Sequence, residues 1–557
     1  MKRMTRLVCL LLVTLLLFGC ASEGTNIQPT TPDSSGVASD IQPETAAKTE
    51  AALAEIAKLG QSPDDNYRTF YEIFVYSFCD SNGDGIGDLN GVTSKLDYLQ
   101  ELGITGIWFM PIHPSQSYHK YDVRDYYEID PDYGTLEDFD AMMAACEERG
   151  INVIIDLVVN HTGNDNAWFT TAVDYLKTLP SGAEPNAEEC KYIDYYFFSR
   201  ESAPGWHAIE GTEWYYEGQF SPHMPDLNLA SEAVKAEITD VMQFWIDRGV
   251  SGFRLDAAKE FYSGNIPANV EVLNWIQTTA TSLKEDCYLV AEVWEAFGAV
   301  TQYYESGITS LFDFPFGNSN GKIPDVLRNA GNAKTVSSYA TALQKANEAY
   351  SAANPDYIDA PFLSNHDVGR IAGFVARDEN KMKLAGAMNI FMSGSCFIYY
   401  GEEIGMLGSG NDPSKRAPMY WNAERDNGTT NPPPECELPE EYPLGSLAEQ
   451  AGNDASLYNY YRQAIAIRNA MPVISHGDTT AETALNVNAI SAQRKTWEDQ
   501  ECIILMNINT VAAQVDLSAY ADWNMVASLS ADGGEITMDG TQLSLPAFGT
   551  AILVPAA

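Results

Sequence analysis

Clusters of charged and amide side chains follow four apolar segments of the chain. In "SGFRLDAAKE", which begins at position 251, Arg254 and Asp256 are set into an apolar run. An arginine two residues from a carboxylate lies on the same face of a strand and holds that carboxylate ionised. Carboxyl groups held in this way are candidates for acid–base or nucleophilic chemistry. The other clusters are Asp156, Asn160 and His161 in "DLVVNH", Glu292 in "AEVWE", and Asn365, His366 and Asp367 in "LSNHD".

The elements that must position these clusters repeat along the chain. From about residue 67, short apolar runs alternate with segments of helical period. We expect strands at 70–78, 104–112, 151–159, 250–256, 287–294, 308–314, 359–367 and 396–403, and helices at 92–103, 135–150, 230–248, 270–284, 336–352, 380–392 and 456–470. Eight such units predict an α/β fold, a (β/α)8 TIM barrel, with an open doubly wound sheet as the alternative. A salt bridge or helix cap would explain any one cluster, but not four at the same end of one barrel.

Two departures from the repeat predict further domains. Residues 163–229, after the third strand, are rich in Trp, Tyr and Pro, and we expect them to form an inserted domain B. Residues 471–557 alternate in polarity, contain turn sequences such as "SADGGE" and show no clear helix, which predicts an antiparallel β-sandwich domain C. The barrel, domain A, would then occupy residues 67–162 and 230–470.

The four clusters, in order, resemble sequence regions of the α-amylase family, glycoside hydrolase family 13. A fifth region, "MPDLN" at 224–228, precedes the fourth strand, and the resemblance covers about residues 67–557. It implies retaining hydrolysis of α-glucosidic bonds, which requires two carboxyl groups about 5–5.5 Å apart. The implied partner is an α-glucan, either starch or maltooligosaccharides.

The resemblance also implies a role for individual residues. Asp256 corresponds to the nucleophile, Glu292 to the general acid/base, and Asp367 to the third carboxylate, which binds sugar hydroxyls. Burial and a neighbouring negative charge predict a raised pKa for Glu292. Tyr121 would stack on the sugar at subsite −1, and His161 and His366 would be neutral hydrogen-bonding partners of that sugar. Lys259 would serve the acceptor side. Arg254 and Asn365 complete the implied set of substrate-binding residues.

Three positions bear on which bond is cleaved. "YHKY" at 118–121 is similar to the α-amylase pattern "YHGY", whereas exo-acting oligo-1,6-glucosidases carry an aspartate at the position of Tyr118. Ala257 stands where 1,6-specific members tend to have valine. Both differences favour an endo-acting α-amylase that cleaves internal α-1,4 bonds. Glu260 replaces a histidine common in α-amylases, and its role stays open.

Other activities remain open. "MPDLN" resembles an intermediate group between oligo-1,6-glucosidases and neopullulanases. An α-glucosidase or oligo-1,6-glucosidase, or a neopullulanase-like enzyme of dual α-1,4/α-1,6 activity, is therefore the alternative. A non-catalytic glucan-binding lipoprotein is an alternative of another class, and the three retained carboxylates argue against it.

A calcium site is predicted in "DSNGDGIGD" at 80–88. The ligand order is that of an EF-hand loop through its ninth position, without the final glutamate, because position twelve is Gly91. The ligands would be Asp80, Asn82, Asp84, the carbonyl of Ile86, and Asp88. An Asx-rich turn without metal is the alternative. By analogy with classical α-amylases, a second calcium could use Asn160 and Asp226.

The N-terminus predicts export. Three basic residues precede an apolar run from Leu7 to Phe18, which indicates a signal peptide at 1–19. "LFGC" resembles a bacterial lipobox with Cys20 as the lipid-bearing residue, although cleavage by an ordinary signal peptidase is an alternative. Residues 20–66 would form a flexible tether. We therefore expect an exported protein, lipid-anchored at a bacterial cell surface, with membrane contact only through the anchor.

Charge and cysteine content exclude several classes of partner. The net charge of −44 disfavours nucleic acid and anionic membrane surfaces through like-charge repulsion. The nine cysteines are scattered and form no CxxC motif, which argues against a disulfide scaffold or a zinc site. We expect a monomer that acts on a neutral substrate.

Overall fold

The computed structural model describes residues 46–426 and 428–556. The expected signal peptide, Cys20 and the first part of the expected tether lie outside these ranges. Helix α1 (Ala47–Ile56) falls within the expected tether, yet it packs against helix α16 (Leu457–Ala470). Thr49 donates its backbone N–H to Asp454 at 2.8 Å, and Arg462 pairs with Glu50 at 2.8 Å. The folded unit therefore begins upstream of residue 67.

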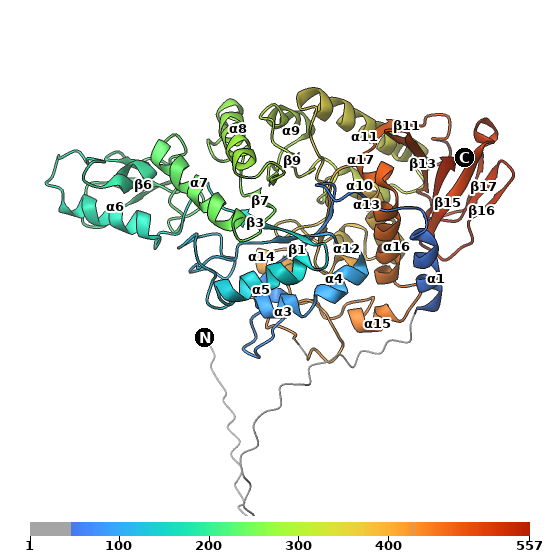
Figure 1. Ribbon diagram of the computed structural model, residues 1–557, viewed down its shortest axis with the longest axis horizontal. Coiled ribbons are helices and arrows are strands. Elements are labelled where there is room, and N and C mark those ends of the chain that lie inside the picture. The colour runs from blue at the N-terminus through green and yellow to red at the C-terminus, as the bar shows by residue number, and fades with distance from the viewer. Residues whose placement is uncertain (1–45, 427, 557) are drawn as a thin grey trace, which may run out of the picture. The chain divides into compact units, whose positions relative to one another are not determined.

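The centre of the molecule is a closed parallel barrel (Figure 1). Its strands are β1 (Thr69–Ile73), β2 (Gly106–Phe109), β3 (Asn152–Leu157), β7 (Gly252–Leu255), β8 (Tyr288–Ala291), β9 (Ser310–Leu311) and β10 (Cys396–Tyr399). The sheet order is β10-β1-β2-β3-β7-β8-β9. Residues 359–361 close it: Ala360 bridges in parallel to Phe312, and Phe397 donates to the carbonyl of Pro361 at 2.9 Å. The predicted (β/α)8 fold is confirmed.

Several strands are shorter than the apolar runs that predicted them. The run at 70–78 leaves the sheet at Ile73 and continues as helix α2 (Val75–Phe78). The run at 359–367 makes only the bridge at Ala360, because Pro361 has no N–H with which to extend the ladder. Irregular backbone follows to residue 370 and carries the "SNHD" cluster.

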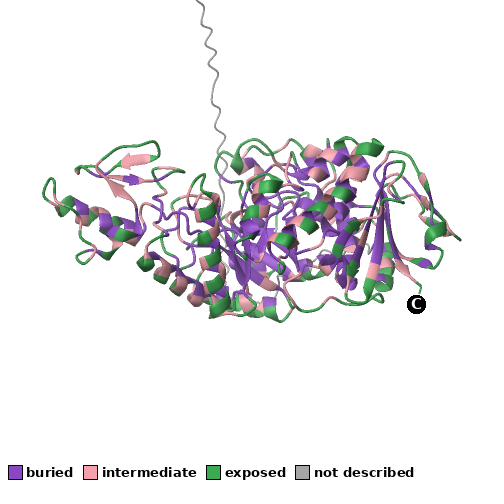
Figure 2. Ribbon diagram, turned by 90° about the horizontal axis from the view of Figure 1, so that it is seen from above, coloured by how far each residue is buried: buried purple, intermediate pink, exposed green. Residues whose placement is uncertain are grey.

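Helices surround the barrel. They are α3 (Leu89–Thr93), α4 (Leu96–Leu102), α5 (Leu136–Glu147), α7 (Glu232–Ile246), α8 (Ile266–Leu283), α9 (Phe297–Tyr304), α10 (Lys322–Arg328), α11 (Ala333–Ala353), α12 (Ile371–Phe374), α13 (Glu379–Ile390), α14 (Asp412–Lys415), α15 (Leu447–Ala451), α16 and the 3-10 turn η2 (Glu402–Ile404). Figure 2 shows buried strands at the centre and exposed residues on the outer faces of the helices. Within the described ranges, every helix is too short or too polar to cross a membrane.

Aromatic side chains fill the barrel interior. Phe70, Trp108, Phe312 and Phe397 belong to one buried cluster contributed by different strands. The guanidinium of Arg254 lies over the Trp108 ring at 5.3 Å. The packed aromatic interior therefore lies directly beneath the charged residues at the strand ends and supports them.

The segment between β3 and α7 contains helix α6 (Ala167–Thr178), the 3-10 turn η1 (Lys191–Tyr195) and a small antiparallel sheet of β4 (Phe198–Ser199), β6 (Tyr215–Glu217) and β5 (Trp206–Ala208). A bridge between His161 and Asp226 joins its two ends. The base of the insertion is thus tied together next to the end of β3.

After α16 and α17 (Pro472–His476) the chain is almost entirely antiparallel β structure, with one 3-10 turn, η3 (Ser518–Tyr520). One sheet contains β11 (Asp478–Ala481), β12 (Ile490–Trp497), β13 (Gln500–Asn507), β18 (Gly549–Pro555) and β15 (Trp523–Ser530), in that order; the other contains β14 (Ala513–Asp516), β17 (Gln542–Leu545) and β16 (Thr537–Asp539). A separate apolar cluster lies between the sheets, as two facing sheets require.

Candidate active site

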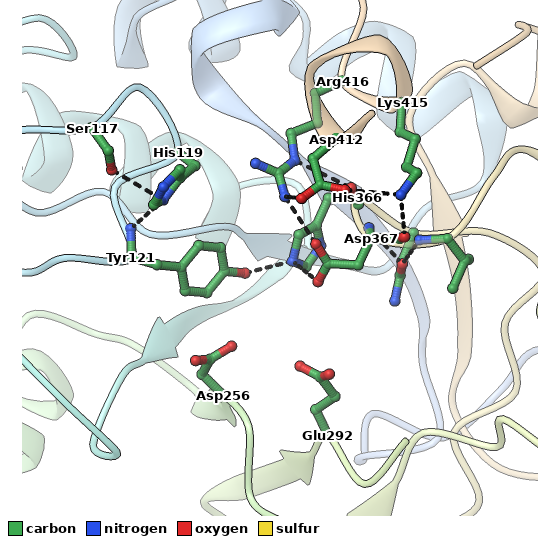
Figure 3. A network of polar contacts seen from close by, with 12 residues as sticks. Ser117, His119, Tyr121, Asp256, Glu292, His366, Asp367, Asp412, Lys415 and Arg416 are labelled. Carbon is green, nitrogen blue, oxygen red and sulfur yellow. Dashed lines mark hydrogen bonds and ion pairs between the residues drawn. The ribbon is translucent and has the colours of Figure 1, made fainter. Parts of the chain in front are cut away.

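A single buried arginine organises three carboxylates at the end of β7. Arg254 donates from one terminal nitrogen to Asp256 at 2.7 Å and to Asp156 at 2.8 Å, and its other terminal nitrogen contacts Glu292. Its side chain is fully buried. We call Arg254, Asp156, Asp256 and Glu292 the Arg254 cluster. Since one guanidinium contacts both Asp256 and Glu292, these two carboxyl groups are neighbours, and Figure 3 shows them facing the same space.

The backbone explains why these residues converge. The β7–β8 ladder continues past both strands: Glu292 donates its N–H to Leu255 at 2.9 Å, and Ala258 donates to the Glu292 carbonyl at 3.0 Å. Ala257, with a φ of 47°, turns the chain out of the strand directly after Asp256. The carboxylates are therefore fixed by a regular sheet and one sharp turn.

Glu292 is suited to donating a proton. Burial raises its pKa to about 7, and the negative charge of Asp256 adds to the rise while Arg254 opposes it. The predicted direction of the shift is confirmed. Burial also raises the pKa of Asp156 to about 6. Arg254 thus contacts two carboxyl groups whose pKa is raised by burial, Glu292 and Asp156.

His366 differs from the sequence-based expectation. Its Nε2 lies 2.9 Å from Asp367 and its Nδ1 lies 2.6 Å from Glu72. Burial alone would lower the pKa of His366, but these two carboxylates raise it to about 9. The prediction of a neutral His366 is therefore wrong, because both ring nitrogens face anions. In turn, although burial raises it, the pKa of Asp367 is held well below its usual range by His366 and by Arg416, which donates to it at 2.8 Å.

His161 agrees with the expectation of a neutral ring. Burial lowers its pKa. Among the described residues its Nε2 has no hydrogen-bond partner, and the side chain lines the cleft. The hydrogen-bonding capacity of this buried nitrogen is therefore unused within the described residues.

The predicted residues divide into those that line the cleft and those behind it. A cavity of about 780 Å³ is lined by Tyr121, His161, Asp256, Lys259, Glu292 and Asp367. Arg254 and His366 are buried behind this surface. Asn365 is also buried, and its side-chain oxygen accepts the N–H groups of Asp367 and Val368, both at 2.8 Å. Asn365 therefore shapes the turn that presents Asp367, and its contact with substrate stays a prediction.

Tyr121 connects the two sides of the site. Its hydroxyl bonds His366 Nε2 at 2.7 Å and accepts from Arg254 at 3.1 Å. Glu260, whose role the sequence leaves open, lines the cleft beside Lys259, with 3.7 Å between the charged atoms.

The sequence singles out Tyr118 but not the residues that line the cleft with it, Asp412, Arg416 and Glu435, and we call these four residues the Arg416 wall. Arg416 donates to Tyr118 at 3.0 Å as well as to Asp367. Asp412, Arg416 and Glu435 come from the connection after β10, whereas Tyr118 comes from the β2–α5 connection, so no local pattern links Tyr118 to the other three. Phe220 and Trp294, 50% and 41% exposed, also line the cavity. Glu72 was also missed, and here the sequence contains a signal: Glu72 is a carboxylate inside an apolar strand.

The predicted calcium loop is held by its own backbone. Asp80 accepts N–H groups from Asn82, Gly83 and Gly85 at 2.7–3.0 Å. Asp88 caps helix α3 by accepting from Gly91 at 2.7 Å. In the part of the chain that the structure describes, no three His, Cys, Asp or Glu side chains form a metal-binding group. The loop supplies hard oxygen donors of the kind Ca²⁺ prefers, so calcium stays a prediction there.

The second predicted calcium position lies where two side chains bond each other. Asn160 donates its side-chain N–H to Asp226 at 3.4 Å, and Asp226 also accepts from the backbone of Gln219 at 3.0 Å. Burial raises the pKa of Asp226 to about 7. A second calcium at Asn160 and Asp226 therefore stays a prediction.

Comparison with known proteins gives a consistent picture. A family model described as the α-amylase catalytic domain matches residues 72–477. Alpha-amylase 3 of Dictyoglomus thermophilum is 36% identical over 448 residues, 79% of this chain and 85% of that protein. A glucan 1,6-alpha-glucosidase of Streptococcus pneumoniae is 30% identical over 459 residues, 72% of this chain and 83% of that protein. The structure of Eubacterium rectale Amy13B is 43% identical, with a TM-score of 0.86, over 89% of this chain and 97% of that chain.

Proposed function

The chain belongs to the α-amylase family, glycoside hydrolase family 13, and from that premise we propose that it is a retaining, endo-acting α-amylase. It would hydrolyse internal α-1,4-glucosidic bonds of starch, amylose and maltooligosaccharides. The observation that supports this specificity is the cleft, whose lining includes Phe220, Trp294 and the Arg416 wall in addition to Asp256 and Glu292. A site that closed directly beyond the reacting sugar would favour cleavage at chain ends.

The geometry supports a double displacement. Protonated Glu292 would donate its proton to the glycosidic oxygen while Asp256 attacks the anomeric carbon, so that the bond to the leaving sugar breaks and a glycosyl ester of Asp256 forms. Glu292, now a carboxylate, would remove a proton from water, and this water would release the sugar with its α configuration retained. Arg254 would hold Asp256 in position for attack through its hydrogen bond, while Asp367 and His161 would bond the hydroxyls of the reacting sugar.

An α-glucosidase or a dual α-1,4/α-1,6 enzyme is the second candidate. The similarity to a relative named glucan 1,6-alpha-glucosidase favours it. Product size against time separates the candidates on amylose, maltotriose, panose and isomaltose. Mixed maltooligosaccharides appearing early from amylose, with isomaltose untouched, support the endo α-1,4 proposal. Glucose alone from the start, or rapid isomaltose cleavage, contradicts it.

We also propose that the protein is exported and lipid-anchored through Cys20, that it is a monomer, and that the loop at 80–88 binds structural Ca²⁺ through Asp80, Asn82, Asp84, Ile86 and Asp88. The support for the anchor is the sequence of the first twenty residues. Metabolic labelling with a palmitate analogue would test it: a Cys20→Ser variant should lose the label, and labelling of both forms would contradict the proposal.

A further inference from the structure

Lys120 has a backbone conformation that lysine rarely adopts. Its φ is 66°, in the left-handed region that favours glycine. The corresponding α-amylase pattern, "YHGY", has glycine at this position. A side chain here costs conformational free energy, so the surrounding structure must stabilise the turn.

A buried ion pair supplies that stabilisation. Lys120 Nζ lies 2.7 Å from Asp130, and both side chains are only 5% exposed. Asp130 also accepts the backbone N–H groups of Ser115 at 3.2 Å and Asp132 at 3.0 Å. Asp130 therefore ties the start and the end of the β2–α5 connection to the turn at Lys120. A buried pair of this kind is strongly destabilised when one partner alone is removed.

The turn at Lys120 presents cleft residues on both of its sides. Tyr118, His119 and Tyr121 all line the cavity. His119 Nδ1 accepts the N–H of Tyr121 at 3.2 Å and faces the hydroxyl of Ser117 at 3.0 Å, as Figure 3 shows. Since these residues lie within two positions of Lys120, a change in its backbone angles would displace all three from the cleft surface.

We propose that Lys120, through its buried ion pair with Asp130, is a positioning residue that holds Tyr118, His119 and Tyr121 against the sugar chain. The proposal rests on the α-glucan hydrolase function given above. Lys120 itself lies behind the cleft and touches no reacting group. The ion pair fixes the turn, and the turn fixes the aromatic and imidazole side chains.

The test compares the full-length wild type with Lys120→Met, Lys120→Gly, Lys120→Arg and Asp130→Asn, using maltoheptaose well below each melting temperature. We expect Lys120→Met and Asp130→Asn to lower kcat/KM about ten- to hundredfold, mostly through kcat, because small displacements of positioned groups reduce turnover strongly. Lys120→Arg should stay near wild type because it keeps the charge. Lys120→Gly should retain more activity than Lys120→Met, because glycine accepts the left-handed angle.

Lys383→Met is the matched control. Lys383 is also buried and ion-paired, with Glu379 at 2.7 Å, but it lies on α13 outside the cleft. The Lys383→Met substitution should lower the melting temperature and leave kcat/KM unchanged. If Lys120→Met and Asp130→Asn behave in the same way, the positioning role is wrong. Should Lys120→Met not fold, Asp130→Asn decides: a lowered kcat/KM supports the positioning role, and an unchanged kcat/KM contradicts it. A wild type that does not cleave maltoheptaose would instead overturn the proposed function.

Discussion

The Arg254 cluster and the Arg416 wall are built by different means. The members of the Arg254 cluster lie within or directly after three neighbouring strands, β3, β7 and β8, and the backbone ladder between β7 and β8 sets the spacing of Asp256 and Glu292. The Arg416 wall joins Tyr118, from the β2–α5 connection, to Arg416, from the connection after β10, through one hydrogen bond. The sheet supplies a fixed geometry for bond cleavage, whereas the connections supply surfaces that can vary in shape. We therefore expect changes in the two regions to have separable effects.

The largest expected effect comes from removing the nucleophile. Asp256→Asn should lower kcat by about 10⁴-fold, because no covalent intermediate can form, and should leave binding of maltooligosaccharides nearly intact. Initial rates and calorimetric titration measure the two properties. Glu260→Gln is the control within the same cleft, and it should retain turnover. Unchanged turnover in Asp256→Asn would contradict the proposed chemistry.

The pH profile comes next in size and isolates the Arg254 cluster. Burial raises the pKa of Glu292 to about 7. The acid must be protonated to donate, so kcat/KM should fall as pH rises through about 7, approaching tenfold per pH unit above it. The profile of Tyr118→Phe should show the same alkaline limb, since Tyr118 does not contact Glu292. An alkaline limb that moves with this substitution would show that the two regions are not separable.

A substitution in the Arg416 wall should change products more than rate. Tyr118→Asp introduces the residue type found in exo-acting relatives and places a carboxylate near Arg416. We expect the early products of amylose to shift toward glucose and maltose, with kcat/KM on amylose lower by about tenfold. Tyr118→Phe removes only the hydrogen bond to Arg416 and should keep the wild-type product pattern. An unchanged product pattern in Tyr118→Asp would show that the Arg416 wall does not determine product size.

The smallest expected effect concerns the loop at 80–88, which belongs to neither region. If it binds Ca²⁺, excess EDTA should lower the melting temperature by a few degrees, because a ligand that binds only the folded state stabilises it. Asp84→Asn should be less sensitive to EDTA than the wild type. Identical melting curves of the wild type with EDTA and with Ca²⁺ would contradict a calcium site.

The sequence predicts the Arg254 cluster well and the Arg416 wall poorly. The barrel and the convergence of Asp256, Glu292 and Asp367 follow from short-range patterns, since charged residues at the ends of parallel strands meet at one face. The charge state of His366 could not be predicted, because it depends on Glu72, which lies 294 positions away in sequence. The place of Arg416 in the site could not be predicted either, because it depends on contacts with Tyr118 and Asp367, which are distant in sequence. Pro361 is visible in the sequence, but its consequence, a seventh strand reduced to one bridge, required the positions of its neighbours.

The central claim is that the Arg254 cluster performs the chemistry with Asp256 as the nucleophile. Incubation with a slowly turned-over 5-fluoro-α-glycosyl fluoride, followed by proteolysis and mass spectrometry of the labelled peptide, tests it most directly. We predict one glycosyl group per chain, attached to Asp256, and no label in Asp256→Asn. A label on Glu292 or Asp367, or inverted product configuration with no label at all, would contradict the account.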